Sequence, residues 1–103
     1  MSRSDPTQMS TSPSFPARIA ALRALADPVR LSLVDELARE QACACELRKL
    51  LGLSTTLLSH HLKVLREAGL IRTRKAGRRV EVELDRDALA LVAKSLLAGE
   101  RAA

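Results

Sequence analysis

The chain is 103 residues long, with 47 % hydrophobic residues, 28 % charged residues and Phe15 as its one aromatic residue. This length is sufficient for one domain, and a core of aliphatic side chains alone is so small that we expect a dimer to bury further surface. The net charge of +5 and the pI of about 10.0 favour an acidic partner such as nucleic acid.

The composition also argues against two other classes of protein. No hydrophobic run is long enough to span a bilayer. Residues 1–16 are rich in Ser, Thr and Pro and lack the apolar stretch of a secretory signal. We therefore expect a cytoplasmic protein without a membrane partner, in which the two cysteines are reduced.

The chain divides into a tail, a domain and a short end. Residues 1–16 are predicted to form a disordered N-terminal tail, because they contain small polar residues and prolines and little apolar surface. Residues 17–98 are predicted to form the folded domain, and residues 99–103 a short C-terminal tail.

Apolar residues at helical spacing predict three helices in the first half of the domain, over residues 17–26, 28–40 and 43–51. Asp27 is expected to cap the second of these helices, because Pro28 suits the first helical position. The side chains expected to face inward are those of Ile19, Leu22, Leu25, Leu31, Val34, Leu37, Leu47, Leu50 and Leu51.

The stretch from Ser54 to Gly69 indicates a fourth helix with a defined start and end. Ser54 can cap its first turn, and Gly69 can adopt the left-handed conformation that often follows a helix. One side of this helix is apolar and carries Leu58, Leu62 and Leu65. The opposite side is polar and carries Thr56, His60, Lys63 and Glu67, with Ser59 at its edge. Such a face suits a DNA major groove, although an ordinary surface helix is also polar outside.

A basic hairpin is predicted directly after this helix. Residues 70–74 and 79–84 look like two strands joined by a turn over residues 75–78, and Val80, Val82 and Leu84 alternate with polar residues. Residues 85–98 then predict a last helix with Leu89, Val92 and Leu96 on one side. The order α-α-α-α-β-β-α indicates a mainly α fold, the winged helix-turn-helix.

Positive charge is concentrated where this architecture would meet DNA. Between Lys63 and Glu81 there are seven basic and two acidic side chains, so this segment alone accounts for the net charge of the chain. Clustered basic residues beside a recognition helix are typical of phosphate binding. A merely solvated surface is the plain alternative, and a membrane surface fits less well because the cluster is split over two elements.

The DNA contacts can be assigned residue by residue on this basis. The side chains expected to face base edges or adjacent phosphates are those of Thr55, Thr56, Ser59, His60 and Lys63. Those expected to hold the DNA backbone through the wing are Arg74, Lys75, Arg78 and Arg79. The rival interpretation is a winged-helix module that binds other proteins and has no ligand of its own.

Three stretches of the sequence resemble the ArsR/SmtB family of bacterial metal-sensing repressors. They are residues 25–31 (LADPVRL), 43–47 (CACEL) and 58–70 (LSHHLKVLREAGL), and the resemblance extends over residues 19–96. It implies a homodimer that forms through its first and last helices and reads an imperfect palindrome in operator DNA. It also implies a ligand that changes DNA affinity, usually by releasing the operator.

The resemblance implies a metal site at Cys43 and Cys45, because many family members bind thiophilic ions with a Cys-x-Cys in this helix. Members that sense arsenite commonly have a third cysteine three residues later, where this chain has Arg48. The same stretches are also similar to a nickel-linked actinobacterial member. We therefore expect nickel, zinc, cadmium or arsenite to bind, with Glu46, tail groups, backbone nitrogens or water completing the site.

Other roles for the two cysteines stay open. Both can be small, partly buried apolar residues, which is common for cysteine. A thiol-redox switch is the main functional rival, and it would need a disulfide between subunits because a bridge across one residue in a helix is strained. An accessory regulatory protein is a further partner to be considered.

The other sites that could carry chemistry fit less well. A second family site on the last helix uses histidines, and this chain has none after His61; Asp85 is instead expected to cap that helix and Asp87 to favour its positive end. His60 should point toward DNA and His61 should be structural, so a metal role for either is the less favoured alternative. The chain has no glycine-rich phosphate loop and no HExxH motif, so we expect no enzyme activity.

Overall fold

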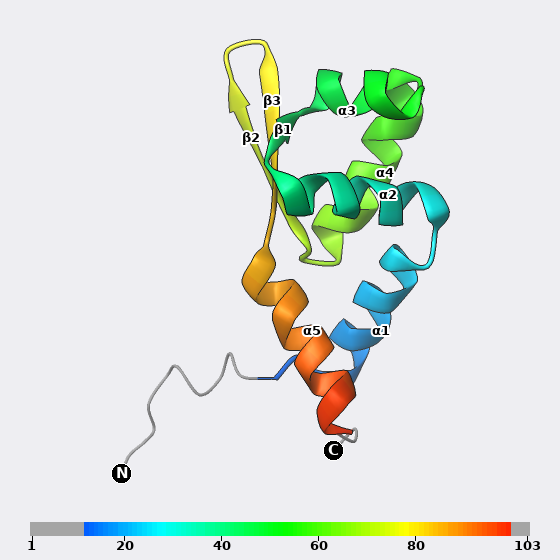
Figure 1. Ribbon diagram of the computed structural model, residues 1–103, viewed down its shortest axis with the longest axis vertical. Helices are drawn as coiled ribbons and strands as arrows, with labels where there is room; N and C mark the ends of the chain where they lie inside the picture. The colour runs from blue at the N-terminus through cyan, green and yellow to red at the C-terminus, as the bar shows by residue number, and fades with distance from the viewer. Residues whose placement is uncertain (1–11, 100–103) are drawn as a thin grey trace.

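The computed structural model describes residues 12–99. Its elements in chain order are α1 (Phe15–Leu25), α2 (Pro28–Arg39), β1 (Ala42–Cys43), α3 (Ala44–Leu51), α4 (Thr55–Glu67), β2 (Ile71–Ala76), β3 (Arg79–Leu84) and α5 (Arg86–Ala98) (Figure 1). The predicted winged helix-turn-helix is confirmed, with one short strand added before α3. No helix in this part of the chain is long and apolar enough to cross a membrane.

The first helix begins two residues earlier than predicted. Ser14 supplies the cap, since its Oγ accepts a hydrogen bond from the backbone N–H of Ala17 at 3.2 Å. Phe15 and Pro16 are therefore helical, and their assignment to a disordered tail was wrong. The expectations for residues 1–11 and 100–103 lie outside the described residues.

The start of α2 is as predicted. The Asp27 carboxylate accepts hydrogen bonds from the backbone N–H groups of Val29 at 2.9 Å and Arg30 at 3.1 Å, and Pro28 takes the first helical position. Both hydrogen bonds lower the pKa of Asp27, and the one from Arg30 has the larger effect. The corner between α1 and α2 is thus fixed by a charged cap.

The short strand β1 was not predicted. It pairs antiparallel with β3, with Ala42 opposite Val82 and Cys43 opposite Glu81, so the sheet order is β1-β3-β2. A helix had been predicted from Cys43, but Cys43 ends the strand and caps α3, which begins at Ala44. Two residues are too few to produce an alternating pattern, and for this reason the sequence carried no signal for β1.

One hydrophobic core joins all five helices to the inner face of the sheet. Its most deeply buried large side chains are those of Leu33, Leu37, Leu47, Leu65, Leu70 and Val82. Three leucines expected inside are instead exposed, with exposed fractions of 47 % for Leu31, 60 % for Leu50 and 47 % for Leu96. Periodicity reveals an apolar stripe, but it does not show which flank of the stripe meets a neighbouring element.

The two ends of the molecule are built from different elements. Figure 1 shows the tip of the β2–β3 hairpin and the turn between α3 and α4 at one end, while α1 and α5 lie together at the other end. The fourth helix α4 runs between these ends, and its first turn lies at the hairpin end.

Candidate nucleic-acid interface

The helix α4 is held by its caps and by its apolar face. The Ser54 Oγ accepts a hydrogen bond from the Leu57 N–H at 3.1 Å. At the other end Gly69 has a φ of 78°, which is the left-handed conformation predicted for it. The predicted inward residues Leu58, Leu62 and Leu65 are all buried. Because both ends of α4 are fixed and its apolar face is buried, its opposite, polar face points away from the core.

The polar face of α4 is open to solvent. Every side chain assigned to base edges or adjacent phosphates is exposed, namely those of Thr55, Thr56, Ser59, His60 and Lys63. A row of short hydroxyl side chains followed by an imidazole and an ammonium group offers both donors and acceptors to base edges.

The hairpin β2–β3 forms a tighter wing than the sequence indicated. Strand pairing continues to Ala76 opposite Arg79, so the turn consists of Gly77 and Arg78 instead of residues 75–78. Gly77 has a φ of 66°, a conformation that glycine adopts at little cost in a two-residue hairpin turn. Arg78 is therefore placed at the tip of the wing.

The four basic residues assigned to the wing differ in their surroundings. Arg74, Lys75 and Arg78 are exposed and make no ion pair with any residue between 12 and 99. Arg79 is also exposed, but its Nε lies 3.1 Å from Oε2 of Glu81, and this hydrogen bond is the main reason why the pKa of Arg79 is raised. The first three cations are thus more available to phosphates than Arg79.

The base of the wing carries two ion pairs that sequence reasoning missed. Arg72 lies opposite Glu83 in the strand register, 3.3 Å from its carboxylate, and 3.0 Å from the carboxylate of Asp85. Asp85 also caps α5 as predicted, because its Oδ1 accepts a hydrogen bond from Ala88 N–H at 3.0 Å. Arg72 therefore links the wing to the start of α5.

The two cysteines are in different environments. Cys43 is buried, while Cys45 is exposed. The Cys43 thiol accepts a hydrogen bond from the Glu46 N–H at 3.4 Å, and the Glu46 carboxylate accepts one from the Cys43 N–H at 2.9 Å. This reciprocal pair caps α3 and lowers the pKa of Glu46. Interaction with the Cys45 side chain, together with burial, raises the pKa of the Cys43 thiol.

The described residues of one chain do not form a closed metal site. Between residues 12 and 99, no group of three or more His, Cys, Asp or Glu side chains could hold an ion together. Cys43 and Cys45 supply two thiols on one short segment, which suits a thiophilic ion only if further donors complete its coordination.

His61 has a hydrogen-bonding partner, as expected for a structural histidine. Its Nδ1 lies 3.2 Å from Nη1 of Arg30. The same guanidinium donates from Nε to the carbonyl oxygen of Ala24 at 2.7 Å. The role of Arg30 was not predicted, because it lies 31 positions before His61 and no local pattern joins them.

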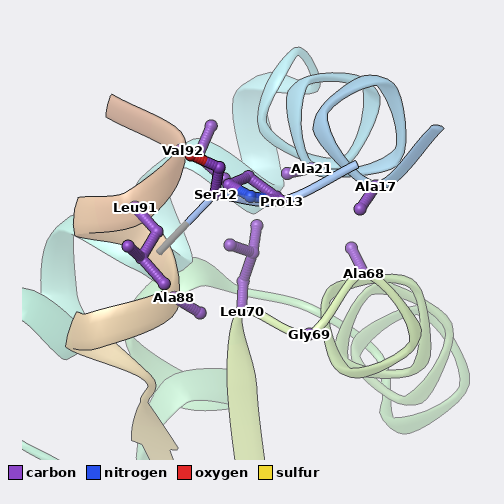
Figure 2. Close-up of a pocket in the computed structure, with 10 residues that line it drawn as sticks. All are labelled: Ser12, Pro13, Ala17, Ala21, Ala68, Gly69, Leu70, Ala88, Leu91 and Val92. Carbon is purple, nitrogen blue, oxygen red and sulfur yellow. The ribbon is translucent and has the colours of Figure 1, made fainter. Parts of the chain in front are cut away.

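An apolar pocket lies away from the basic face. It has a volume of about 290 Å³ and is bounded by α1, α5 and the turn that follows α4 (Figure 2). Ala17, Ala21, Leu70, Leu91 and Val92 are among the side chains that line it. None of its lining residues is charged, so the pocket offers mainly shape and apolar contact.

Comparisons with known proteins agree with this geometry. The model of the family described as "Bacterial regulatory protein, arsR family" matches residues 27–73. The chain is 43 % identical over 61 residues to a transcriptional repressor SmtB homolog of Synechocystis sp., a match that covers 59 % of this chain and 46 % of that protein. It is 36 % identical over 75 residues to an arsenical resistance operon repressor of Staphylococcus xylosus, covering 73 % of this chain and 72 % of the relative.

A solved structure gives the same result for the fold. The crystal structure of an ArsR family transcriptional regulator superimposes with a TM-score of 0.74 at 28 % identity, over 84 % of this chain and 89 % of that chain. The chain spans about half the length of curated relatives such as the Synechocystis protein.

Proposed function

We propose that this chain, which belongs to the ArsR family of bacterial regulatory proteins, is a sequence-specific transcriptional repressor that acts on operator DNA in the cytoplasm. One observation carries the proposal: the first turn of α4, whose threonine side chains are exposed, lies at the same end of the molecule as the exposed basic tip of the wing. The helix would read bases in the major groove while the wing holds the backbone.

The proposed active form is a homodimer made through α1 and α5. These helices expose 50 % of Phe15, 47 % of Leu96 and 89 % of Leu97. A second copy would cover this apolar surface and the adjoining pocket (Figure 2). Because the dimer would be twofold symmetric, its two α4 helices would meet the two halves of a palindrome.

Titration of labelled DNA from upstream of its own gene tests the DNA-binding function. We expect affinity to fall steeply as salt rises, since phosphate contacts release counterions, and to fall when the sequence is scrambled. An affinity that depends on neither salt nor sequence would contradict the proposal and favour a protein-interaction module.

We further propose that Cys43 and Cys45 hold a thiophilic or divalent transition-metal ion that regulates DNA binding. The relative from Staphylococcus xylosus is a repressor of an arsenical resistance operon, which supports a ligand of this class. Nickel, zinc, cadmium and arsenite are the candidates. The remaining donors would come from Glu46, from the N-terminal segment, from backbone nitrogen or from water.

The position of Cys43 suggests how such an ion would act. The thiol that would bind the ion also caps α3, the helix that precedes the recognition helix α4. Binding would compete with the hydrogen bond from the Glu46 N–H and would remove the thiol proton. Because the pKa of this thiol is raised, we expect metal affinity to increase with pH.

Calorimetric titration of the reduced protein with each of the four candidate ions tests the ligand. We expect one site per subunit in the wild type and its loss in the Cys43→Ser/Cys45→Ser variant. Unchanged binding in that variant would assign the site to other donors. Absence of binding by all ions, combined with a change in DNA affinity on oxidation, would favour a thiol-redox repressor.

A further inference from the structure

The guanidinium of Arg30 connects three helices at one point. Arg30 lies in the first turn of α2, where its backbone N–H is held by the Asp27 cap. Its side chain donates to the Ala24 carbonyl in the last turn of α1 and reaches Nδ1 of His61 on α4. The carbonyl groups in the last turn of a helix have no partner within that helix. The hydrogen bond from Arg30 therefore also supplies a partner for the Ala24 carbonyl of α1.

The contact with His61 requires a neutral imidazole. Arginine has donors only, so Nδ1 must carry its lone pair and accept the hydrogen bond. A proton on Nδ1 would replace this attraction by contact between two cations. The charged groups that act on His61 are Asp27 and Arg30 from the corner between α1 and α2, and His60 from its own helix.

The surroundings of His61 favour the neutral form. Burial is the main influence that lowers the pKa of His61 below its ordinary value of 6.5, and Arg30 and His60 act in the same direction while Asp27 opposes them. The folded state therefore resists the proton that the unfolded chain accepts below pH 6.5. The contribution of this contact to stability is complete above pH 6.5 and decreases as the pH falls below that value.

We propose that the Arg30–His61 contact is a proton-sensitive joint that holds the recognition helix at a fixed angle to α1. This inference rests on the proposed DNA-binding function. If α1 lies at the dimer interface, the joint sets how the two recognition helices are presented to the operator. Protonation of His61 opens the joint, and operator affinity decreases in acid while affinity for unrelated DNA is retained. Arg30 is thus a positioning residue that contacts no DNA.

The joint can be tested first without DNA. Titration of the His61 ring signals by NMR should give a pKa below 6.5 in the wild type. Replacement of Arg30 by glutamine should raise that pKa, because a neighbouring cation is removed. Arg39→Gln is the matched control, since Arg39 lies on the same helix and pairs with Glu36 at the surface. Equal His61 pKa values in wild type and Arg30→Gln would contradict the proposal that the Arg30–His61 contact is proton-sensitive.

The consequence for DNA is tested with His61→Asn and His61→Leu. Asparagine keeps an acceptor near the position of Nδ1 and cannot be protonated in this range, whereas leucine fills the space without an acceptor. Binding to operator and scrambled duplexes should be measured from pH 7.5 to 5. Each protein should be measured both with and without His60→Gln. A protonated His60 near phosphate would strengthen binding in acid and mask the effect, while the proteins that retain His60 set the basal discrimination, because His60 is itself assigned to base contacts.

We expect the ratio of operator to scrambled affinity to drop about tenfold in acid with His61, and to stay constant with His61→Asn. His61→Leu and Arg30→Gln should show the lowered ratio at every pH, and Arg39→Gln should behave like the wild type. Melting curves at each pH identify any variant that is unfolded. An acid-induced drop that persists in His61→Asn would overturn the proposal. A wild type that never distinguishes the operator would instead refute the DNA-binding function. The NMR titration would then still show whether Arg30 and His61 form the proton-sensitive contact.

Discussion

His60 and Arg78 represent the two kinds of contact that the proposed interface would make. His60 is exposed on the polar face of α4, and Arg78 is exposed at the tip of the wing. A side chain in the groove distinguishes one base pair from another, whereas a cation at the backbone attracts any DNA. The two residues should therefore respond differently to truncation.

Substitution of each by alanine should separate these contributions. His60→Ala should reduce discrimination at one or two positions by about 1–3 kcal/mol each. Arg78→Ala should weaken binding to all sequences alike and reduce the salt slope by about one. Affinities for a panel of single-base operator variants would measure both. If His60→Ala weakened binding to all sequences alike and Arg78→Ala changed discrimination between bases, the assignment of His60 to the groove and Arg78 to the backbone would be wrong.

Cys43 has a structural role besides its proposed role as a ligand. Its thiol accepts a hydrogen bond at the start of α3, where serine is among the residues preferred by helices. Cys43→Ala should lower the melting temperature, while Cys43→Ser should largely retain it. Cys45→Ala is the matched control, because Cys45 is exposed and does not cap the helix. Equal melting temperatures for the two alanine variants would refute the capping role.

At the scale of elements, the starts of α2, α4 and α5 were the most predictable features. Asp27, Ser54 and Asp85 each accept hydrogen bonds from backbone groups two or three positions ahead, so the information is local. The strand β1 and the contact of Arg30 with His61 depend on residues that are distant in the sequence. The metal ligands were inferred from family resemblance, and a single chain cannot reveal donors that a partner would supply.

The N-terminal segment gives a test at this scale. The first helix was predicted to begin at Ala17, but Ser14 caps it and it begins at Phe15. Removal of residues 1–11 should leave the dimer folded and the melting temperature unchanged. Ser14→Ala should cost about 1 kcal/mol of unfolding free energy, because the Ala17 N–H loses its capping oxygen. Thermal or denaturant unfolding would measure both. A large loss on truncation would indicate that the tail packs against the domain or its partner.

At the scale of the whole molecule, the wing tip and the first turn of α4 lie at one end, while α1 and α5, which expose Phe15, Leu96 and Leu97, form the other end. A second copy of the chain is the partner proposed to cover this surface, on which Leu97 is 89 % exposed. Leu97→Glu should shift a dimer toward monomers and weaken operator binding at least about tenfold, since two linked half-sites bind more tightly than one. Leu50→Glu, which alters an exposed leucine on α3, should leave the dimer intact. Sedimentation analysis would show no difference between the two variants if α5 were not at the interface.

The most direct test of the central claim is selection of bound sequences from a pool of random DNA duplexes by the full chain. If a dimer presents two copies of α4 to DNA, the enriched sequences should contain an inverted repeat whose half-site centres lie about one helical turn or a multiple of it apart. The enrichment should decrease in His60→Ala. Sequencing that shows no enriched motif, or a motif without twofold symmetry, would contradict the account of this protein as a dimeric repressor.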